Sequence, residues 1–272
     1  GSGFKPVIYS AALEAGMTPS SIIVDSPVKA GGWHPMNASR RYYGPTPLRT
    51  ALTYSRNVVA VKLLQKVGID KAVKLAMDMG FEASELPRVL PLALGAGSAS
   101  PLRMAQMYSV FANGGFRVDP YFIARVDTDS GKTVYKATPP TACIDCEVTD
   151  RPTEGTARRV ISPRTHYMMN SMLRDVVRMG TAKKALALGR ADVAGKTGTT
   201  NNFLDAWFDG YTPALVTVAW FGYDTYKTLG HGMMGGDLAL PMWVKFMREA
   251  LKGVPEYRFP VPAGGHAKKV KT

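Results

Sequence analysis

The chain has 272 residues, of which 46% are hydrophobic and 20% charged, a composition typical of a globular protein with one large or two small domains. Its 34 Lys and Arg against 21 Asp and Glu give a formal charge of +13, which suits an anionic substrate, a membrane surface or nucleic acid. The basic residues lie outside any nucleic-acid module, no run of about 18 apolar residues predicts a membrane span, and no signal sequence opens the chain.

The first part of the chain predicts helices separated by a loop. Ser2 is a suitable N-cap for a helix that ends near Gly16. Frequent Pro and Gly over residues 17–47 predict mostly loop. Helical periodicity then returns over residues 48–54 and 58–67.

Three further helices have clear start signals. Asp70 is expected to cap a helix that ends near residue 80. Ser100-Pro101 and Ser162-Pro163 each place proline at the first helical position after a capping serine. The last of these helices carries an apolar stripe that we expect in the core: Met168, Met169, Met172, Leu173 and Val176.

The second part of the chain predicts β-structure. Short β-like runs separated by turns between residues 116 and 160 predict an insertion that carries a hairpin. Consecutive antiparallel strands are then expected at residues 193–199, 206–211 and 214–223. A final amphipathic helix is predicted over 241–251, and the basic stretch 264–272 has nothing to bury.

The chain has two cysteines, Cys143 and Cys146, in a polar and turn-rich stretch. A zinc ribbon needs two further ligands that the neighbouring sequence does not contain, and the four histidines lack ligand spacing, so no metal site is predicted. We predict a small local disulfide if the compartment is oxidising, with a pair of reduced thiols as the alternative.

Ser2 and Lys5 form an S-x-x-K motif at the start of the first predicted helix. A serine hydroxyl becomes a good nucleophile when a nearby base removes its proton, and residues three apart on a helix share one face. The motif alone is weak, because it recurs at Ser26 and Lys29. That copy lies in a proline-containing loop without helical spacing, so we assign Ser26 to the scaffold.

Two further motifs carry polar side chains suited to a cleft. Lys196-Thr197-Gly198 lies in a predicted strand, where the lysine and nearby hydroxyls can hold a carboxylate and the glycine permits close approach. An ordinary edge strand is the alternative. Ser55-Arg56-Asn57 interrupts two helical stretches, and taken alone it is best explained as a helix cap and turn.

The order S-x-x-K, S-x-N, K-T-G resembles the signature of penicillin-binding proteins and serine β-lactamases. The stretches FKPVIYSAAL, residues 43–63, SPLRMAQMYSVFANGG and GKTGTTNNFLDAWFDGYTP are similar to class A penicillin-binding proteins. The resemblance covers nearly the whole chain. It implies an α/β (α+β) fold, with an antiparallel sheet flanked by helices, an all-helical lobe, and the family's N-terminal strands absent from this chain.

The resemblance also implies a domain division. Residues 1–255 correspond to the D,D-transpeptidase domain, with a β-rich excursion around 116–160, and residues 256–272 form a basic C-terminal tail. Family members have strands before the S-x-x-K helix, whereas only Gly1 precedes Ser2 here, so we expect a sheet edge that upstream residues complete.

By the resemblance, Ser2 attacks the carbonyl between the two terminal D-alanines of a peptidoglycan stem peptide and forms an acyl-enzyme, which a neighbouring stem amine accepts. Lys5 is the expected general base, and Lys196 favours its neutral form. Ser55 is expected to relay the proton to the leaving amine, while Asn57 orients Lys5.

The same resemblance implies the binding groups. Thr197 and Thr199, on either side of Gly198, would hold the substrate carboxylate, and the backbone N–H groups of Ser2 and Thr199 would form the oxyanion hole. β-Lactams would acylate the same serine, and the reaction requires no cofactor.

Other activities use a similar cleft. A class A β-lactamase needs an E-x-x-L-N loop that is absent here; Glu82 and Glu85 are the nearest acidic candidates. A D,D-carboxypeptidase shares the residues but passes the acyl group to water, and a β-lactam-binding or sensor module would not turn over. DNA or membrane binding by the positive charge is the remaining alternative.

The resemblance implies a parent protein at the periplasmic face of the bacterial cytoplasmic (inner) membrane, with an upstream membrane anchor and a peptidoglycan glycosyltransferase domain. The implied partners are peptidoglycan stem peptides, β-lactam antibiotics and the membrane through that anchor. Regulators of cell-wall synthesis are a further class of partner compatible with the resemblance. A nucleic-acid partner is not implied.

Overall fold

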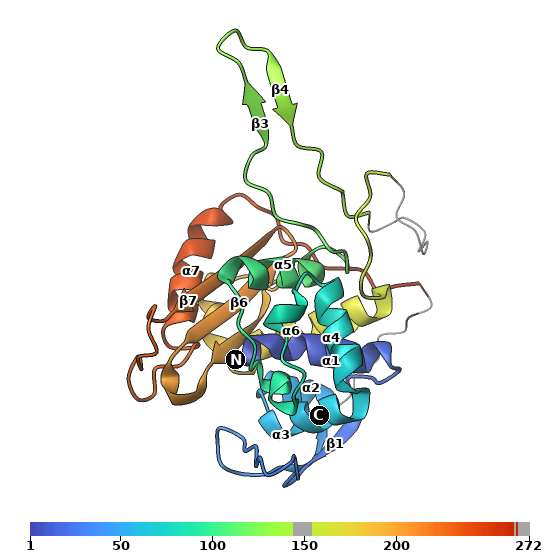
Figure 1. Ribbon diagram of the computed structural model, residues 1–272, viewed down its shortest axis with the longest axis vertical. Coiled ribbons are helices and arrows are strands. Elements are labelled where there is room, and N and C mark those ends of the chain that lie inside the picture. Colours follow the sequence, from blue (N-terminus) through green and yellow to red (C-terminus); the bar gives the residue numbers. More distant parts are fainter. Residues whose placement is uncertain (144–153, 264, 266–272) are drawn as a thin grey trace.

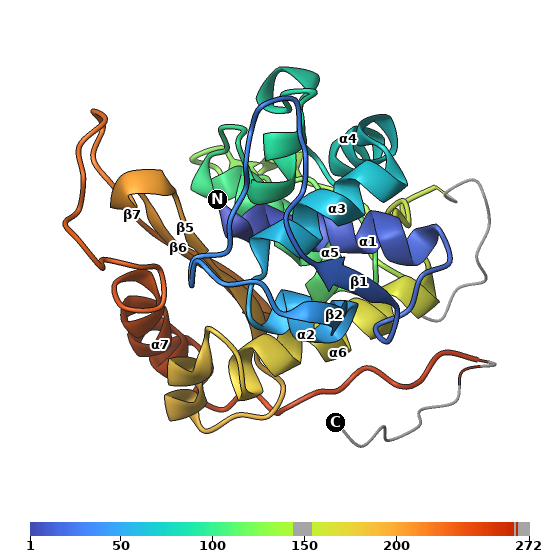
Figure 2. The same cartoon turned by 90° about the horizontal axis from the view of Figure 1, so that it is seen from below.

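The computed structural model describes residues 1–143, 154–263 and 265, and places helices on both faces of an antiparallel sheet (Figures 1 and 2). The α-helices are α1 (Lys5–Glu14), α2 (Leu48–Thr53), α3 (Asn57–Val67), α4 (Ile69–Asp78), α5 (Pro101–Ala112), α6 (Pro163–Arg178) and α7 (Ala239–Ala250). The strands are β1 (Ile22–Asp25), β2 (Gly44–Pro47), β3 (Arg125–Asp127), β4 (Thr133–Lys136), β5 (Ala194–Thr199), β6 (Ala206–Thr212) and β7 (Leu215–Phe221). Short 3-10 helices are η1 (Ser2–Phe4), η2 (Ala83–Glu85), η3 (Leu90–Leu94), η4 (Lys183–Leu188) and η5 (Asn201–Phe203).

The central sheet has the order β5-β6-β7, with consecutive antiparallel strands as predicted. Side chains alternate between the two faces of a strand. On one face of β6, Phe208 packs edge-on against Trp243 of α7, with ring centroids 5.0 Å apart. On the other face, Tyr211 lies against Tyr108 of α5, with centroids 6.4 Å apart. The sheet is therefore sandwiched between α7 and the helical lobe (Figure 2).

Helices α5 and α6 begin where the cap signals predict. The side chains of Ser100 and Ser162 accept hydrogen bonds from the backbone N–H groups of Arg103 and Thr165, respectively. The predicted apolar stripe of α6 is in the core, since four of its five members are fully buried: Met169, Met172, Leu173 and Val176.

The predicted N-cap role of Ser2 is wrong. Gly1 is the residue before the helical segment, and Ser2 opens the 3-10 turn η1, in which the Phe4 N–H donates to the Gly1 carbonyl at 3.1 Å. The chain enters α1 through this tighter turn, and no side-chain cap is formed. Asp70 likewise does not cap α4; it lies in the first turn after Gly68, whose φ of 94° favours glycine.

The loop prediction for residues 17–47 missed a small sheet. Strands β1 and β2 pair antiparallel, with Ile22 opposite Pro47 and Val24 opposite Pro45. Pro cannot donate a ladder hydrogen bond, so it is tolerated in a strand only at an edge. The sheet has two strands, both are therefore edges, and the prolines fit.

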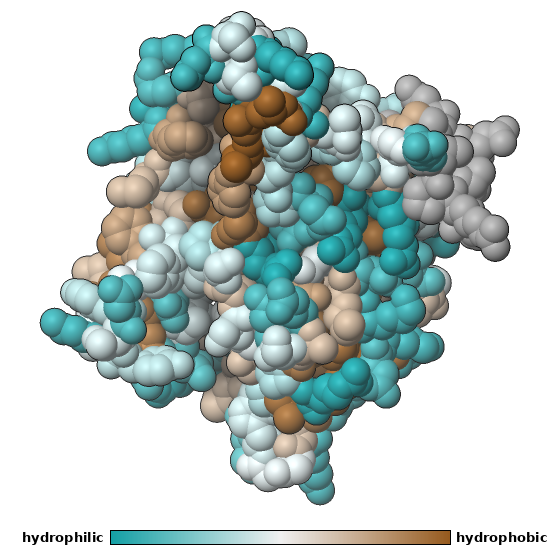
Figure 3. Space-filling view, turned by 45° about the horizontal axis from the view of Figure 1, so that its top comes forward, coloured by the Kyte–Doolittle hydropathy of each residue, from teal (hydrophilic) through white to brown (hydrophobic). Residues whose placement is uncertain are grey.

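The predicted insertion carries the hairpin β3–β4, which projects from the body of the molecule (Figure 1). Every residue of both strands is exposed. On the face seen in Figure 3, hydrophobic surface is bordered by hydrophilic surface. The insertion that carries the hairpin also exposes apolar side chains, among them Phe122 at 86% exposure. Cys146 lies outside the described residues, as do residues 264 and 266–272 of the basic tail, so the predicted disulfide with Cys143 and the predicted tail stay predictions.

Candidate active site

The three sequence motifs meet at one cleft. Ser2 opens η1, Ser55 and Asn57 lie at the junction of α2 and α3, and Thr197 and Thr199 lie on β5; all five line the same large pocket. Lys5 and Lys196 are completely buried and do not themselves line the pocket. Residues up to 197 positions apart in sequence (199 − 2) are thus brought together, as the motif order predicts.

The 3-10 turn explains the relation of Ser2 to Lys5. In a 3-10 helix the side chains at i and i+3 eclipse one another, so Ser2 and Lys5 lie on the same side of the chain. Among the described residues, no hydrogen bond joins the two side chains. Catalytic hydrogen bonds are often long in an unliganded site, so the geometry is compatible with proton transfer once a substrate is bound.

Lys5 is the centre of a hydrogen-bond network. Its Nζ donates to Asn57 Oδ1 at 2.7 Å, to the Ser55 carbonyl at 2.8 Å and to Ser55 Oγ at 3.0 Å. Asn57 is itself fixed, because its Nδ2 donates to the Met36 carbonyl at 2.9 Å. Asn57 is therefore in direct contact with Lys5, as its predicted orienting role requires.

Lys196 reaches the same hydroxyl from the other side. Its Nζ donates to Ser55 Oγ at 2.9 Å and to the Thr197 carbonyl at 3.0 Å. Ser55 Oγ thus lies between two lysines, one from the start of α1 and one from β5. A hydroxyl can accept a hydrogen bond from one group while donating its own hydrogen to another, so Ser55 Oγ is suited to transfer a proton between neighbouring groups.

Burial perturbs both lysines. Desolvation lowers the pKa of Lys5 well below its ordinary value, and the positive charge of Lys196 lowers it further. Desolvation also lowers the pKa of Lys196 to about 7, although the carboxylate of Asp209 raises it in part. A neutral Lys5 can accept a proton near neutral pH, which a free lysine cannot do.

The turn that carries Ser55 is a Schellman motif. The Ser55 N–H donates to the Leu52 carbonyl at 3.1 Å and the Arg56 N–H to the Ala51 carbonyl at 2.8 Å, closing the end of α2. Ser55 has φ 56°, in the left-handed region that this position requires and that glycine usually occupies. The helix end thereby aims the Ser55 side chain at Lys5 and Lys196.

Gly198 is needed for packing inside the protein. A Cβ at this position would lie 2.9 Å from Trp207 Cβ on β6 and 3.4 Å from the Gly3 nitrogen on η1. Glycine therefore lets β5 approach the turn that bears Ser2. The close approach predicted for this position exists, and its partner is the protein's own backbone.

The penicillin-binding protein transpeptidase domain model matches residues 1–246. The chain belongs to this family.

Its relatives include the penicillin-binding proteins 1A of Pseudomonas aeruginosa, 40% identical, and Neisseria lactamica, 44% identical. Each match covers 97% of this chain but 37% and 33% of the relative, so the chain spans about a third of their length. The crystal structure of penicillin-binding protein 1A from Haemophilus influenzae superposes with a TM-score of 0.89 at 36% identity, covering 97% of this chain and 43% of that one. The Mycobacterium tuberculosis penicillin-binding protein PonA1 gives 0.81 at 26%, covering 100% and 76%.

Two contacts of this transpeptidase domain were missed by the sequence analysis. Thr197 Oγ1 and Thr181 Oγ1 share a hydrogen bond of 2.7 Å, and Thr199 Oγ1 accepts from the Gly235 N–H at 3.1 Å. Thr181 follows the end of α6, and Gly235 lies in the loop before α7. Both are ordinary turn residues with no periodic signal that could have marked them.

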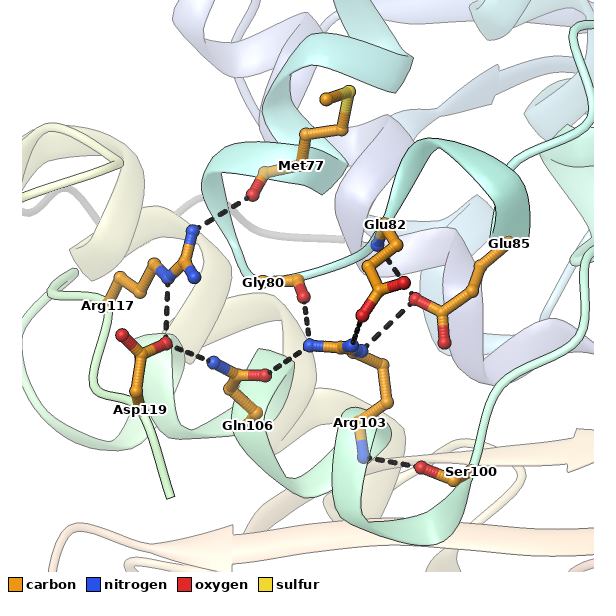
Figure 4. Close-up of polar contacts among 9 residues, drawn as sticks. All are labelled: Met77, Gly80, Glu82, Glu85, Ser100, Arg103, Gln106, Arg117 and Asp119. Carbon is orange, nitrogen blue, oxygen red and sulfur yellow. Dashed lines mark hydrogen bonds and ion pairs between the residues drawn. The ribbon is translucent and has the colours of Figure 1, made fainter. Parts of the chain in front are cut away.

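The two acidic residues considered for a deacylating water are engaged elsewhere (Figure 4). Arg103 of α5 bonds Glu82 at 2.9 Å and Glu85 at 3.1 Å, and its guanidinium also donates to the Gly80 carbonyl. Glu85 further accepts from the Glu82 N–H at 2.8 Å. These carboxylates hold η2 against α5, which gives them a structural role in this penicillin-binding fold.

Among the residues that the structure describes, no group of three or more His, Cys, Asp or Glu side chains is placed to hold a metal ion. No helix within the same residues has the length and apolar character needed to span a bilayer.

Proposed function

We propose that this domain is a serine D,D-transpeptidase that crosslinks peptidoglycan stem peptides and is acylated by β-lactams. The observation that carries the proposal is Ser55 Oγ, held between Lys5 and Lys196 at 3.0 and 2.9 Å at the base of the cleft that Ser2 lines. A serine, a buried lysine and a second hydroxyl in that order form a proton path for acyl transfer. Among the solved relatives, PonA1 has been determined in complex with penicillin V.

In the first half-reaction, neutral Lys5 takes the proton of Ser2 Oγ as that oxygen attacks the carbonyl between two terminal D-alanines. The peptide C–N bond breaks, and the leaving amine receives a proton through Ser55 Oγ. Free D-alanine departs and the stem peptide remains as an ester on Ser2. In the second half-reaction the amine of a neighbouring stem attacks the ester, its proton passes to Lys5, and Ser2 regains its hydrogen.

Binding groups flank this path. We assign Thr197 and Thr199 to the substrate carboxylate, because both carry hydroxyls on β5 beside the cleft. We assign the backbone N–H groups of Ser2 and Thr199 to the oxyanion hole; a Cβ on Gly1 would lie 3.3 Å from the Thr199 carbonyl oxygen, which shows how closely η1 approaches β5. Loss of one such donor typically slows a reaction about a hundredfold or more.

The relatives are longer than this chain, and we extend the proposed function to a protein of their length. We infer a membrane-anchored cell-wall enzyme that acts at the periplasmic face of the inner membrane and carries a glycosyltransferase domain. The support is the identity of 40% and 44% with penicillin-binding proteins 1A about three times as long as this chain.

The test is the intact mass of the full-length protein after incubation with a penicillin, alongside its Ser2→Ala variant. We expect a lasting adduct on the unchanged protein and none on the variant. Ser26→Ala, in the second S-x-x-K copy, is the matched control and keeps the adduct. Absence of an adduct on folded protein would refute the acyltransferase assignment.

A second measurement separates the possible fates of the acyl group. Incubation with a stem peptide and an acceptor amine is expected to yield a crosslinked product. Release of D-alanine with hydrolysed peptide alone would indicate a D,D-carboxypeptidase, and a permanent adduct without turnover of the peptide would indicate a β-lactam-binding module.

A further inference from the structure

Asp209 of β6 is a buried carboxylate that no step proposed above uses. Its side chain is 0% exposed, and neither carboxyl oxygen has a hydrogen-bond partner. Leaving a carboxylate unpaired inside a protein is energetically costly, so the packing of the fold gives no reason for an acidic residue here. An explanation has to come from what surrounds it.

The position of Asp209 relates it to both catalytic lysines. In the register of the sheet it lies directly opposite Lys196, and residues paired in this way point to the same face. A Cβ on Gly3, the residue after the nucleophile, would lie 2.2 Å from Asp209 Oδ2. The carboxyl group therefore sits beneath the turn that joins Ser2 to Lys5, beside the strand that carries Lys196.

The groups around this carboxyl come from two neighbouring elements. Lys196 faces it from β5 and the hydroxyl of Tyr108 from α5. Burial raises the pKa of Asp209 to about 7, and the positive charge of Lys196 opposes this rise. In return, the Asp209 carboxylate raises the pKa of Lys196. No direct ion pair joins Asp209 to Lys196, so their interaction acts through space.

We propose that Asp209 is a positioning residue that keeps Lys196 protonated, and so fixes the direction of the hydrogen bonds along Lys196, Ser55 and Lys5. A protonated Lys196 can only donate to Ser55 Oγ, and Lys5 Nζ donates to the same oxygen, which leaves the hydroxyl hydrogen of Ser55 free to point into the cleft toward the leaving amine. The same positive charge attracts the substrate carboxylate toward Thr197. This inference rests on the proposed function.

The test is the pH profile of penicillin acylation in the full-length protein and in Asp209→Asn. Asparagine keeps the size of the side chain and removes its charge. An opposite charge nearby shifts a pKa by about 1–3, so the limb on which activity falls with rising pH should move about one pH unit lower. On that alkaline side the variant is expected to react about tenfold more slowly, while the acid limb, set by Lys5, stays in place.

Controls separate a tuning effect from damage to the fold. Asp175→Asn breaks the 2.6 Å ion pair of Asp175 with Arg49 on α2, away from the cleft, and should leave the profile unchanged. Asp209→Ser is a second charge-removing variant and should move the same limb if asparagine does not fold. An alkaline limb that coincides with that of the unchanged protein overturns the inference, whereas failure of the unchanged protein to be acylated overturns the proposed function instead.

Discussion

At the scale of single residues, the cleft depends on two lysines that are costly to bury. Lys5 and Lys196 are both fully buried, and both bond the same serine hydroxyl. Burial opposes their positive charge, which is the condition that a lysine needs in order to act as a base near neutral pH. The chemistry of the site and the stability of the fold therefore depend on the protonation of the same atoms.

Replacing Lys5 by methionine should abolish acylation without unfolding the protein. Methionine has a similar length and removes the proton acceptor, and loss of a general base typically costs 10²–10⁴-fold. Lys62→Met is the matched control, because Lys62 Nζ also bonds a serine hydroxyl, that of Ser26 at 2.7 Å, outside the cleft. A penicillin adduct that forms on the Lys5 variant at the unchanged rate would remove Lys5 from the mechanism.

The stability of the protein should respond to pH through Lys196. Its pKa is about 7 in the fold against 10.5 in an unfolded chain, so between these values the unfolded state binds more protons and the stability due to this group rises with pH. The Lys196→Met variant lacks this dependence. The melting temperature of the variant minus that of the unchanged protein should be highest at pH 6–7 and should decline toward pH 10. A difference that does not change with pH would contradict the lowered pKa of Lys196.

At the scale of elements, two helices begin with similar caps but different surroundings. Ser100 caps α5 through the Arg103 N–H alone, whereas Ser162 of α6 also bonds the Glu14 carboxylate of α1 through its N–H and its hydroxyl, at 2.8 and 2.9 Å. The second cap therefore links α6 to α1 as well as capping the N-terminus of α6.

Removal of the two caps should have unequal effects. Ser100→Ala is expected to cost about 1 kcal/mol of unfolding free energy, or about 2–4 °C in melting temperature. Ser162→Ala should cost more, because it also loses the hydroxyl bond to Glu14. In a Glu14→Ala background that excess should vanish, and denaturant unfolding of the four variants measures it; equal costs in the original background would show that the link to Glu14 contributes nothing.

The elements also show why some features could be read from the sequence and others could not. The caps of α5 and α6 and the three strands of the central sheet have local signals, and these predictions were confirmed. Strand β2 has the sequence GPTP, which lacks β-branched and aromatic residues except for one threonine, and it forms only because β1 supplies a partner. Asp209 and Thr181 join the site through sheet register and a turn, neither of which a motif encodes.

At the scale of the whole molecule, the hairpin β3–β4 stands apart from the body that carries the cleft (Figure 1). Its strands bury no side chain, and they contact chiefly each other. The Ala137 N–H donates to the Ala124 carbonyl at 2.9 Å, so the two sides of the excursion already face one another below the hairpin.

The hairpin can therefore be shortened without harm to the cleft. Replacing residues 125–136 by Asn-Gly closes the chain between Ala124 and Ala137 with a two-residue turn. We expect the penicillin acylation rate to stay within about twofold and the melting temperature to change little, because little apolar surface is exposed by the change. A large loss of acylation in the shortened protein would show that the hairpin supports the active site.

The left-handed backbone at Ser55 has a consequence for engineering. A non-glycine residue in this conformation costs about 1–2 kcal/mol, which glycine would recover at the end of α2. Glycine would also remove the hydroxyl that lies between Lys5 and Lys196. Selection for a relaxed backbone and selection for the proposed catalytic turnover thus favour different residues at position 55, and a library screened for heat resistance alone would favour loss of the proposed proton relay.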